Sequence, residues 1–228
     1  MQTMLYPDGA IILFNKPLGW TSFNAVGAVR RITGLRKVGH AGTLDPLATG
    51  LLIICVGKYT KRINEFMGQQ KEYTGSITLG STTPTYDLES EPEHIVDTQH
   101  ITAEMLLKAT LPFTGAIQQI PPTHSAIKKN GVRAYTLARQ GIAVKMEPRH
   151  VTINQFSIET ELMPIIPFKV ICTTGTYIRS LANDYGAALG VGGHLSKLCR
   201  TRIGQALLVN ADDEITLTEK MKGHKFEV

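Results

Sequence analysis

The segment formed by residues 39–50 could do chemistry, because a carboxylate and an imidazole lie among small residues. Its ionisable side chains are Asp45 and His40, and an apolar run follows directly at residues 51–56. Functional side chains often lie on loops that a rigid scaffold positions, and Pro46 biases Asp45 toward an extended backbone. The alternative is an Asp-Pro turn in which Asp45 only caps local N–H groups. Spacing alone leaves both interpretations open.

A second candidate is the segment TTGTYIRS at residues 173–180. Here Arg179 would lie in the first turns of a helix that follows a strand. A cation at a helix N-terminus opposes the helix dipole, so we expect Arg179 to pair with a carboxylate or phosphate. Asp45 is the partner we expect, and a structural ion pair elsewhere is the alternative.

Several familiar sites are excluded. Gly57-Lys58 resembles the end of a phosphate-binding loop, but Leu52 occupies the upstream glycine position and Tyr59 replaces Ser or Thr. The chain has no G-x-G-x-x-G motif, and its seven histidines lack the i, i+4 spacing of a metal site. The sequence therefore predicts neither a metal nor a cofactor.

Composition indicates a folded protein that does not span a membrane. The chain has 228 residues, of which 43% are hydrophobic and 19% charged, which excludes a disordered or fibrous chain. The apolar run at residues 51–56 is too short to cross a bilayer, and the first eight residues lack a signal-peptide pattern. We expect a cytoplasmic protein, and a monomer.

The charges are sorted along the chain. Residues 16–75 hold nine basic and three acidic side chains, and residues 105–150 hold seven basic and one acidic, whereas residues 76–104 hold six acids and no Lys or Arg. If the basic segments share a face, that face attracts a polyanion while the acidic segment points away. The alternative is that these are simply solvated faces.

Hydrophobic periodicity predicts a mixed α+β fold, since strands and helices do not alternate strictly. The expected strands cover residues 9–14, 51–56, 73–79, 151–158, 168–173 and 194–203, and the expected helices cover residues 23–33, 103–109 and 177–189. Ser22 is expected to cap the first helix without a capping box, because Ala25 stands where Glu would. Residues 115–141 form a long polar excursion.

At these motifs the chain resembles the TruB family of RNA pseudouridine synthases. The segment GHAGTLDPLATGLL at residues 39–52 is similar to the family's loop almost letter for letter. Four further stretches agree in order: NKP at residues 15–17, KEY at 71–73, PPTHSAIK at 121–128 and GTYIRSLA at 175–182. The resemblance covers roughly residues 9–215, and several motifs in register are far more specific than one.

The resemblance implies conversion of uridine 55 to pseudouridine in the T loop of tRNA, with no metal or cofactor. It implies a single catalytic domain over residues 1–228 with the pseudouridine synthase fold, a bent and largely antiparallel sheet flanked by helices. Residues 115–149 match an inserted segment that clamps the T arm. The C-terminal RNA-binding module that many members carry is expected to be absent. The basic residues of the insertion expected to contact the RNA backbone are Lys128, Lys129, Arg133 and Arg139.

The resemblance also assigns roles in the reaction. Asp45 matches the nucleophilic aspartate, which attacks the ribose or the base or acts through a glycal, and Arg179 matches the arginine that pairs with it. Lys16 and Pro17 match a motif that we interpret as supporting the loop.

Four further residues are assigned to the target base. Tyr73 matches the tyrosine that stacks on it, and His40 matches the histidine that takes its place when it leaves the stack. Tyr177 and Leu198 match positions that line the uracil pocket. Two alternatives remain: a pseudouridine synthase that acts on another structured RNA, and an RNA-binding or tRNA-folding protein.

Overall fold

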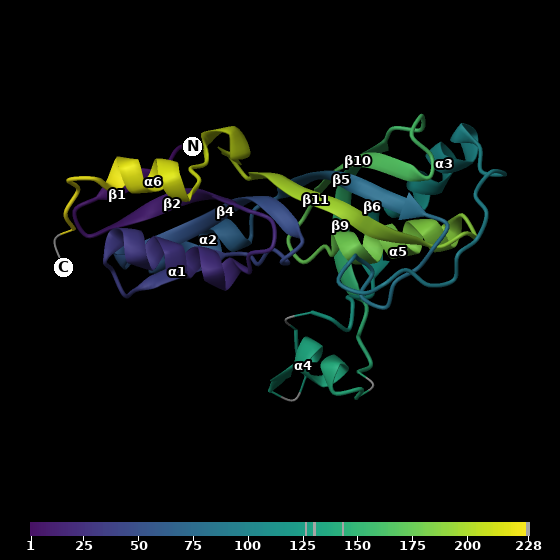
Figure 1. Ribbon diagram of the computed structural model, residues 1–228, viewed down its shortest axis with the longest axis horizontal. Helices are drawn as coiled ribbons and strands as arrows, with labels where there is room; N and C mark the ends of the chain where they lie inside the picture. The colour runs from purple at the N-terminus through teal and green to yellow at the C-terminus, as the bar shows by residue number, and fades with distance from the viewer. Residues whose placement is uncertain (126, 130, 143, 227–228) are drawn as a thin grey trace. The chain divides into compact units, whose positions relative to one another are not determined.

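The computed structural model describes residues 1–125, 127–129, 131–142 and 144–226. The chain divides into two compact units, each described here by itself: unit 1 comprises Met1–Thr74 with Leu198–Val228, and unit 2 comprises Gly75–Lys197. Strands and helices are mixed in both, so the predicted α+β class is confirmed (Figure 1). A single catalytic domain over residues 1–228 stays a prediction. In the described ranges, no helix has the length and apolarity needed to cross a membrane.

Unit 1 is built on a sheet with the strand order β1-β2-β4-β11, to which β3 adds on β4 and β12 on β11. Its elements are β1 (Met4–Tyr6), β2 (Gly9–Lys16), α1 (Ser22–Thr33), β3 (Val38–Ala41), β4 (Ala48–Gly57), η1 (Lys58–Arg62), α2 (Ile63–Met67), the start of β5 (Lys71–Leu79), the end of β11 (Gly193–Ile203), β12 (Ala206–Leu207), η3 (Leu208–Asn210) and α6 (Glu214–Met221). Strands β2 and β3 run antiparallel to β4, whereas β11 runs parallel to it.

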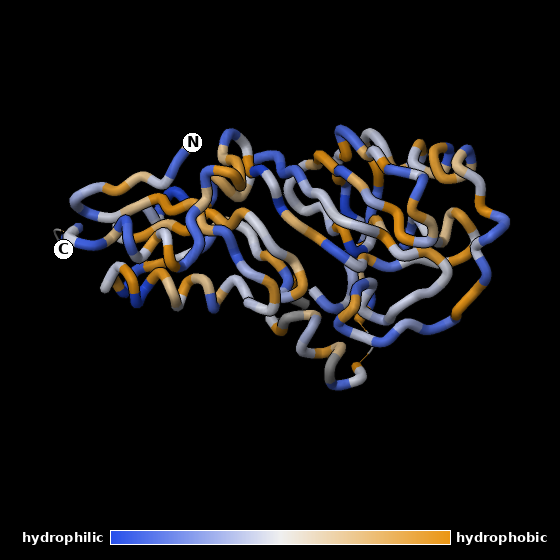
Figure 2. The backbone as a smooth tube through the Cα atoms, turned by 45° about the horizontal axis from the view of Figure 1, so that its top comes forward, coloured by the Kyte–Doolittle hydropathy of each residue, from blue (hydrophilic) through white to orange (hydrophobic). Residues whose placement is uncertain are grey.

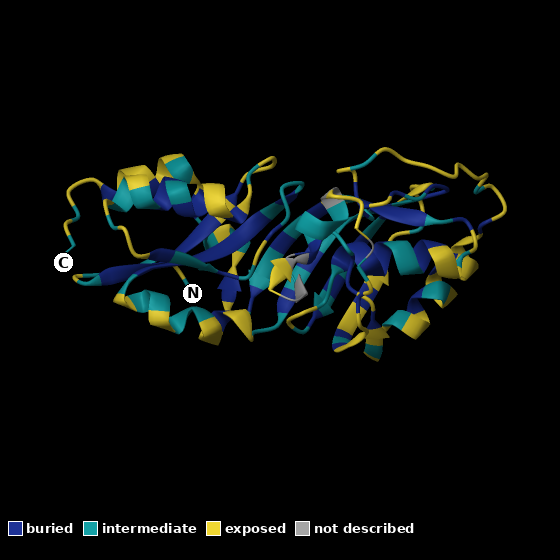
Figure 3. Ribbon diagram, turned by 90° about the horizontal axis from the view of Figure 1, so that it is seen from below, coloured by how far each residue is buried: buried dark blue, intermediate teal, exposed yellow. Residues whose placement is uncertain are grey.

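Strands β2 and β4 are apolar on both faces because both faces are covered. Ile12 and Ile54, which are paired in register, lie in a core with α1 and α6, while Leu13 and Ile53 lie in a second core with Phe66 of α2. This explains the unbroken apolar run that predicted a buried strand at residues 51–56. Figure 3 shows the burial along these strands, and Figure 2 the alternating hydropathy along α1.

Helix α1 is capped one residue earlier than predicted. The N-cap is Thr21, whose side chain accepts a hydrogen bond from the N–H of Asn24, and the Asn24 side chain accepts in turn from the Thr21 N–H. A capping box is therefore present, and the prediction that Ser22 caps the helix without one was wrong. In a capping box the partner is the third residue after the cap. Counted from Thr21 this residue is Asn24, which takes the place of the usual Glu, whereas counted from Ser22 it is Ala25.

Unit 2 has the strand order β5-β10-β9-β6, and β6–β9 and β9–β10 are antiparallel. Its further elements are α3 (Ala103–Thr110), η2 (Leu111–Phe113), β6 (Gly115–Gln119), β7 (Lys128–Lys129), β8 (Val132–Arg133), α4 (Ala134–Arg139), β9 (Arg149–Ile158), β10 (Ile165–Cys172) and α5 (Ile178–Ala188). The antiparallel pairings confirm the largely antiparallel sheet that the resemblance implied.

Helix α5 is anchored by its buried Tyr185. The ring lies edge-on to Phe156 of β9, with centroids 5.4 Å apart, and its hydroxyl donates to the carbonyl oxygen of Leu106 in α3. Phe156 also contacts Phe168 of β10 edge-on. These contacts fix the helix on the sheet and so position its first turn, which carries Arg179.

The predicted insertion over residues 115–149 does not leave the sheet at residue 115. Gly115–Gln119 forms β6, which pairs with β9 in a ladder from Gly115↔Ile153 to Gln119↔Arg149. The residues between β6 and β9 hold the short elements β7, β8 and α4. The side chains of Lys128, Lys129, Arg133 and Arg139 lie outside the described part of the structure, so their contacts with RNA stay predictions.

Candidate active site

The loop that carries Asp45 connects β3 to β4 by a tight turn. The N–H of Ala48, the first residue of β4, donates to the carbonyl oxygen of Asp45 over 3.1 Å. Pro46 occupies the second position of this turn, where its fixed φ is favoured. Two residues into β4, Gly50 has a φ of 99°, and a Cβ there would lie 2.5 Å from the carbonyl oxygen of Arg200. Glycine is therefore required for β11 to approach β4 beside the loop.

Ser22 holds the middle of the loop. Its buried hydroxyl accepts a hydrogen bond from the N–H of Leu44 over 2.8 Å and donates to the carbonyl oxygen of the same residue over 3.1 Å. One side chain at the start of α1 thus satisfies both polar groups of the residue before Asp45. This explains why a serine stands beside the true cap, Thr21.

Arg200 of β11 donates hydrogen bonds to backbone carbonyl groups at both ends of the loop. Its side chain is buried, with 1% exposure, and Nε donates to the carbonyl oxygen of Leu51 over 2.8 Å. The two terminal nitrogens donate to the carbonyl oxygens of Thr43 and Gly42 over 3.4 and 3.1 Å. A guanidinium suits this position because its planar fork reaches several acceptors at once. No sequence motif singled out Arg200 for this role.

Lys16, at the end of β2, is a second buried cation beside the loop. Its side chain is fully buried, and Nζ donates to the carbonyl oxygens of Trp20 and Pro17 over 2.5 and 3.0 Å. Burial lowers the pKa of Lys16 to about 8, the charge of Asp45 opposes this shift, and the charge of Arg200 adds to it. Asp45 is therefore electrostatically coupled to a buried ammonium group.

His40 lies in β3, where its surroundings favour the uncharged form of the ring. Burial lowers the pKa of His40, a backbone hydrogen bond with Gly42 opposes the shift, and the nearby charge of Arg200 lowers the pKa further. A neutral, flat and partly polar ring is suited to stack where a base has left.

The remaining candidates in unit 1 lie on β11 and β5. Leu198 is buried and stands opposite Ala48 in the parallel ladder, so it lies directly beside the turn that carries Asp45. Tyr73 is buried on β5, and its neighbour Glu72 accepts a hydrogen bond from Thr201 of β11 over 2.9 Å. Unit 1 thus places the loop and Leu198 side by side, with the start of β5 joined to the end of β11.

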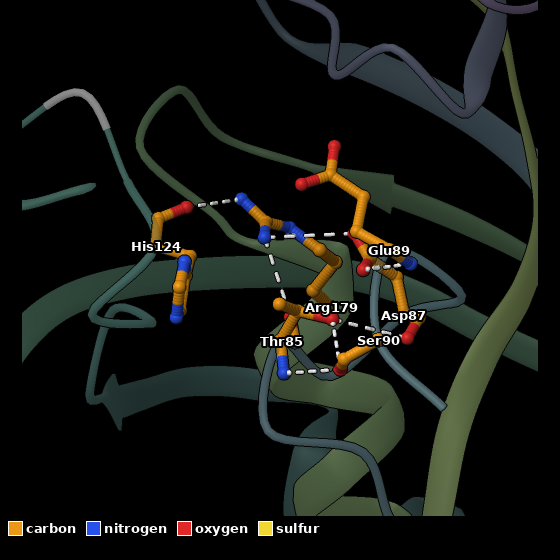
Figure 4. Close-up of polar contacts among 6 residues, drawn as sticks. All are labelled: Thr85, Asp87, Glu89, Ser90, His124 and Arg179. Carbon is orange, nitrogen blue, oxygen red and sulfur yellow. Dashed lines mark hydrogen bonds and ion pairs between the residues drawn. The ribbon is translucent and has the colours of Figure 1, made fainter. Parts of the chain in front are cut away.

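In unit 2, Arg179 is buried and makes three described contacts (Figure 4). One terminal nitrogen lies 3.5 Å from a carboxylate oxygen of Asp87 and donates to the carbonyl oxygen of Thr85 over 3.3 Å. The other donates to the carbonyl oxygen of His124 over 2.8 Å. Arg179 therefore has a carboxylate partner, as its place at a helix N-terminus predicted.

That partner was not the expected one. Asp87 belongs to the acidic segment 76–104, which would point away from a shared basic face or be solvated under the two alternatives for the charge pattern, yet Asp87 is buried against Arg179. Asp87 is held in turn, because it accepts from the N–H of Glu89 over 3.0 Å. Asp45 belongs to unit 1 and Arg179 to unit 2, and the pairing between these two stays a prediction.

Similar proteins place the chain in a family. Residues 30–178 match the family model described as TruB family pseudouridylate synthase, N terminal domain. The chain belongs to the TruB family of pseudouridylate synthases. Among the similar TruB relatives, the tRNA pseudouridine synthase B of Flavobacterium johnsoniae is 50% identical over 94% of this chain and 96% of its own. The protein of the same name from Bacteroides fragilis is 47% identical over 99% of both chains.

Solved structures also share the TruB fold. The chain is similar to one in the crystal structure of a Cbf5-Nop10-Gar1 complex, with a TM-score of 0.71 and 28% identity over 93% of this chain and 54% of that one. It is also similar to one in an H/ACA RNP bound to a substrate RNA containing 2'-deoxyuridine, with a TM-score of 0.70 and 25% identity over 96% and 56%. The chain spans about half the length of these solved chains.

Proposed function

We propose that this protein converts uridine 55 in the T loop of tRNA to pseudouridine. The proposal rests on the position of Asp45, a carboxylate on a turn. Ser22, Arg200 and Lys16 hold this turn through hydrogen bonds with the backbone of residues near Asp45. Relatives of nearly the same length are named tRNA pseudouridine synthase B. The T arm as the target, a monomer as the active form and the cytoplasm as the compartment are parts of this proposal.

Asp45 acts as the nucleophile that frees the uracil from its ribose. The bond between C1′ and N1 breaks, the base turns, and a bond between C1′ and C5 forms. The hydrogen on C5 is then lost to solvent as a proton while N1 takes one up, so the product is an isomer of the substrate. A carboxylate can form a covalent ester in such a reaction. Lys16 stabilises the carboxylate electrostatically, since the two charges are coupled.

The target base must leave the stack before Asp45 can reach it, which costs a few kcal/mol. The neutral ring of His40 fills the vacated place, and Tyr73 stacks on the extruded base. Tyr177 and Leu198 line the pocket that receives it. Lys128, Lys129, Arg133 and Arg139 neutralise phosphates, which contributes affinity rather than sequence choice.

The test is Asp45→Asn, assayed by tritium release from a tRNA transcript carrying [5-³H]uridine. We expect release to fall below detection while the Kd for tRNA stays within about threefold of wild type, because the amide keeps the shape of the carboxylate but is not nucleophilic. Asp97→Asn, at an exposed position, is the matched control and should behave as wild type. Turnover by Asp45→Asn would remove Asp45 from its role.

The substrate is tested separately. Release should require uridine at position 55 of the transcript and disappear when cytidine replaces it. Mapping of pseudouridine in RNA from a deletion strain should show a single loss in the T loops of tRNAs. A loss in another structured RNA would point to a different substrate, and wild-type protein that binds tRNA without modifying it would point to a folding factor.

A further inference from the structure

The first turn of α5 carries two residues of the proposed site but has no cap of its own. The N-cap is Tyr177, whose side chain makes no capping hydrogen bond, and the first turn holds no acidic residue. Arg179 instead places a positive charge at the positive end of the helix dipole. Contacts from outside the helix must therefore fix this turn.

Gln119 supplies such a contact. Its side chain is buried, with 3% exposure. The amide nitrogen of Gln119 donates to the carbonyl oxygen of Tyr177 over 3.0 Å, and its amide oxygen accepts from the N–H of the same residue over 2.8 Å. One side-chain amide thus pairs with both backbone polar groups of Tyr177, as a neighbouring strand would.

The residues after Gln119 bind the same turn. The carbonyl oxygen of Ile120 accepts from the hydroxyl of Ser180 over 2.8 Å, and that of His124 accepts from Arg179. Gln119 ends β6 and is paired with Arg149 in the sheet. Gln119 therefore links the turn that carries Tyr177 and Arg179 to the sheet.

We infer that Gln119 is a positioning residue for the reaction, which fixes the Tyr177 backbone so that Tyr177 meets the extruded uracil and Arg179 keeps the orientation in which it is predicted to pair with Asp45. The inference rests on the proposed function, because only that reaction makes the rate depend on how these two residues are oriented. Gln119 acts through Tyr177 and does not itself touch the substrate. Misplacement of reacting groups by about 1 Å can cost on the order of 100-fold in rate.

The chain offers a matched pair of variants. Gln119→Met removes both hydrogen bonds at nearly constant length, while Gln118→Met makes the same change at the neighbouring exposed position of β6. Under single-turnover conditions with saturating enzyme, we expect Gln119→Met to lower the rate by about 10- to 100-fold, with the Kd for tRNA within about threefold. Gln118→Met should keep the wild-type rate. Equal rates for the two variants would overturn the inference.

A second variant separates positioning from general stabilisation. In Gln119→Glu the carboxylate can still accept from the Tyr177 N–H, but it donates to the Tyr177 carbonyl only when protonated. The rate of Gln119→Glu divided by the wild-type rate should therefore rise as the pH falls from 8 to 6, whereas the same ratio for Gln119→Met stays flat. All rates are measured well below the melting temperature of each variant. A flat ratio for Gln119→Glu would contradict the positioning role.

If Gln119→Met does not fold, the pH profile of Gln119→Glu carries the test. The two proposals fail in different ways. Wild-type protein that forms no pseudouridine refutes the proposed function, whereas active wild-type protein with unimpaired Gln119 variants refutes only the role of Gln119.

Discussion

The guanidinium of Arg200 donates a 3.1 Å hydrogen bond to the carbonyl oxygen of Gly42, three residues before Asp45. With its bonds to Thr43 and Leu51, Arg200 satisfies carbonyl groups at both ends of the loop and contributes a buried positive charge. The loop that carries Asp45 is thus held through the backbone carbonyl groups of its neighbours.

Arg200→Lys is expected to reduce turnover about 10- to 100-fold, because an ammonium group cannot reach the carbonyls of Gly42, Thr43 and Leu51 together. Unfolding in urea should show a loss of about 2–4 kcal/mol, since buried carbonyl groups lose their donors. Arg202→Lys is the control, because Arg202 lies two residues along β11 and its side chain is partly exposed. Equal turnover in the two variants would contradict a role for Arg200 in holding the loop.

Ser22→Ala should lower turnover and reduce stability by about 1–3 kcal/mol, because the buried N–H and C=O of Leu44 lose their shared partner. Thr21→Ala is the control. It removes the helix cap and should cost about 1 kcal/mol, but leave turnover near wild type. Urea unfolding and single-turnover rates measured on both variants check this. Wild-type rates in both variants would contradict a role for Ser22 in holding the loop.

Asp87→Asn should destabilise the protein by about 3–5 kcal/mol, because it leaves the Arg179 guanidinium buried without its described carboxylate partner. Turnover should fall as well, since Arg179 loses one of the contacts that fix its orientation. Asp97→Asn, in the same acidic segment but exposed, should change neither property. Thermal unfolding and tritium release test the pair, and an unaffected Asp87→Asn protein would argue against a structural ion pair here.

The buried Lys16 makes stability depend on pH in a defined direction. Burial lowers the pKa of Lys16 from 10.5 to about 8 in the folded protein. Between these values the unfolded chain binds a proton that the folded protein has released, so the contribution of Lys16 to stability rises with pH. Below pH 8 both states are protonated, and the cost of burying the charge is present in full.

Urea unfolding of wild type and Lys16→Met at pH 7.5 and pH 10 measures this effect. The difference between the two proteins should shift in favour of wild type by about 2–3 kcal/mol over that range. Lys58→Met, at an exposed position, controls for the loss of a lysine. A difference that does not change with pH would mean that the ammonium group of Lys16 is hydrated in the folded protein.

Strands β2 and β4 were predictable from the sequence because they are buried on both faces. Residues 51–56 have no polar member, and such a short run between glycines is typical of a central strand. The cap of α1 was harder to predict, because Thr21 and Ser22 are adjacent hydroxyl residues and both are used. Only the tertiary fold shows that Thr21 caps the helix while Ser22 binds Leu44.

The charged residues of the site were the least predictable part. Arg200 lies among basic residues of a strand, a pattern that equally suits a solvated or RNA-facing surface, and its burial follows from the parallel pairing of β11 with β4. Asp87 lies in a run of acids whose other members are exposed. No local pattern separates it from them, because its partner Arg179 is distant in sequence.

The hydrogen bonds of Arg200 span 149 to 158 residues of sequence. Contacts between such distant segments carry a large loop-closure cost, which slows their formation. During synthesis residues 42–51 are made well before β11, so the loop that carries Asp45 gains its contacts with Arg200 only after β11 has been added. A nascent chain that lacks β11 therefore lacks the hydrogen bonds that hold this loop.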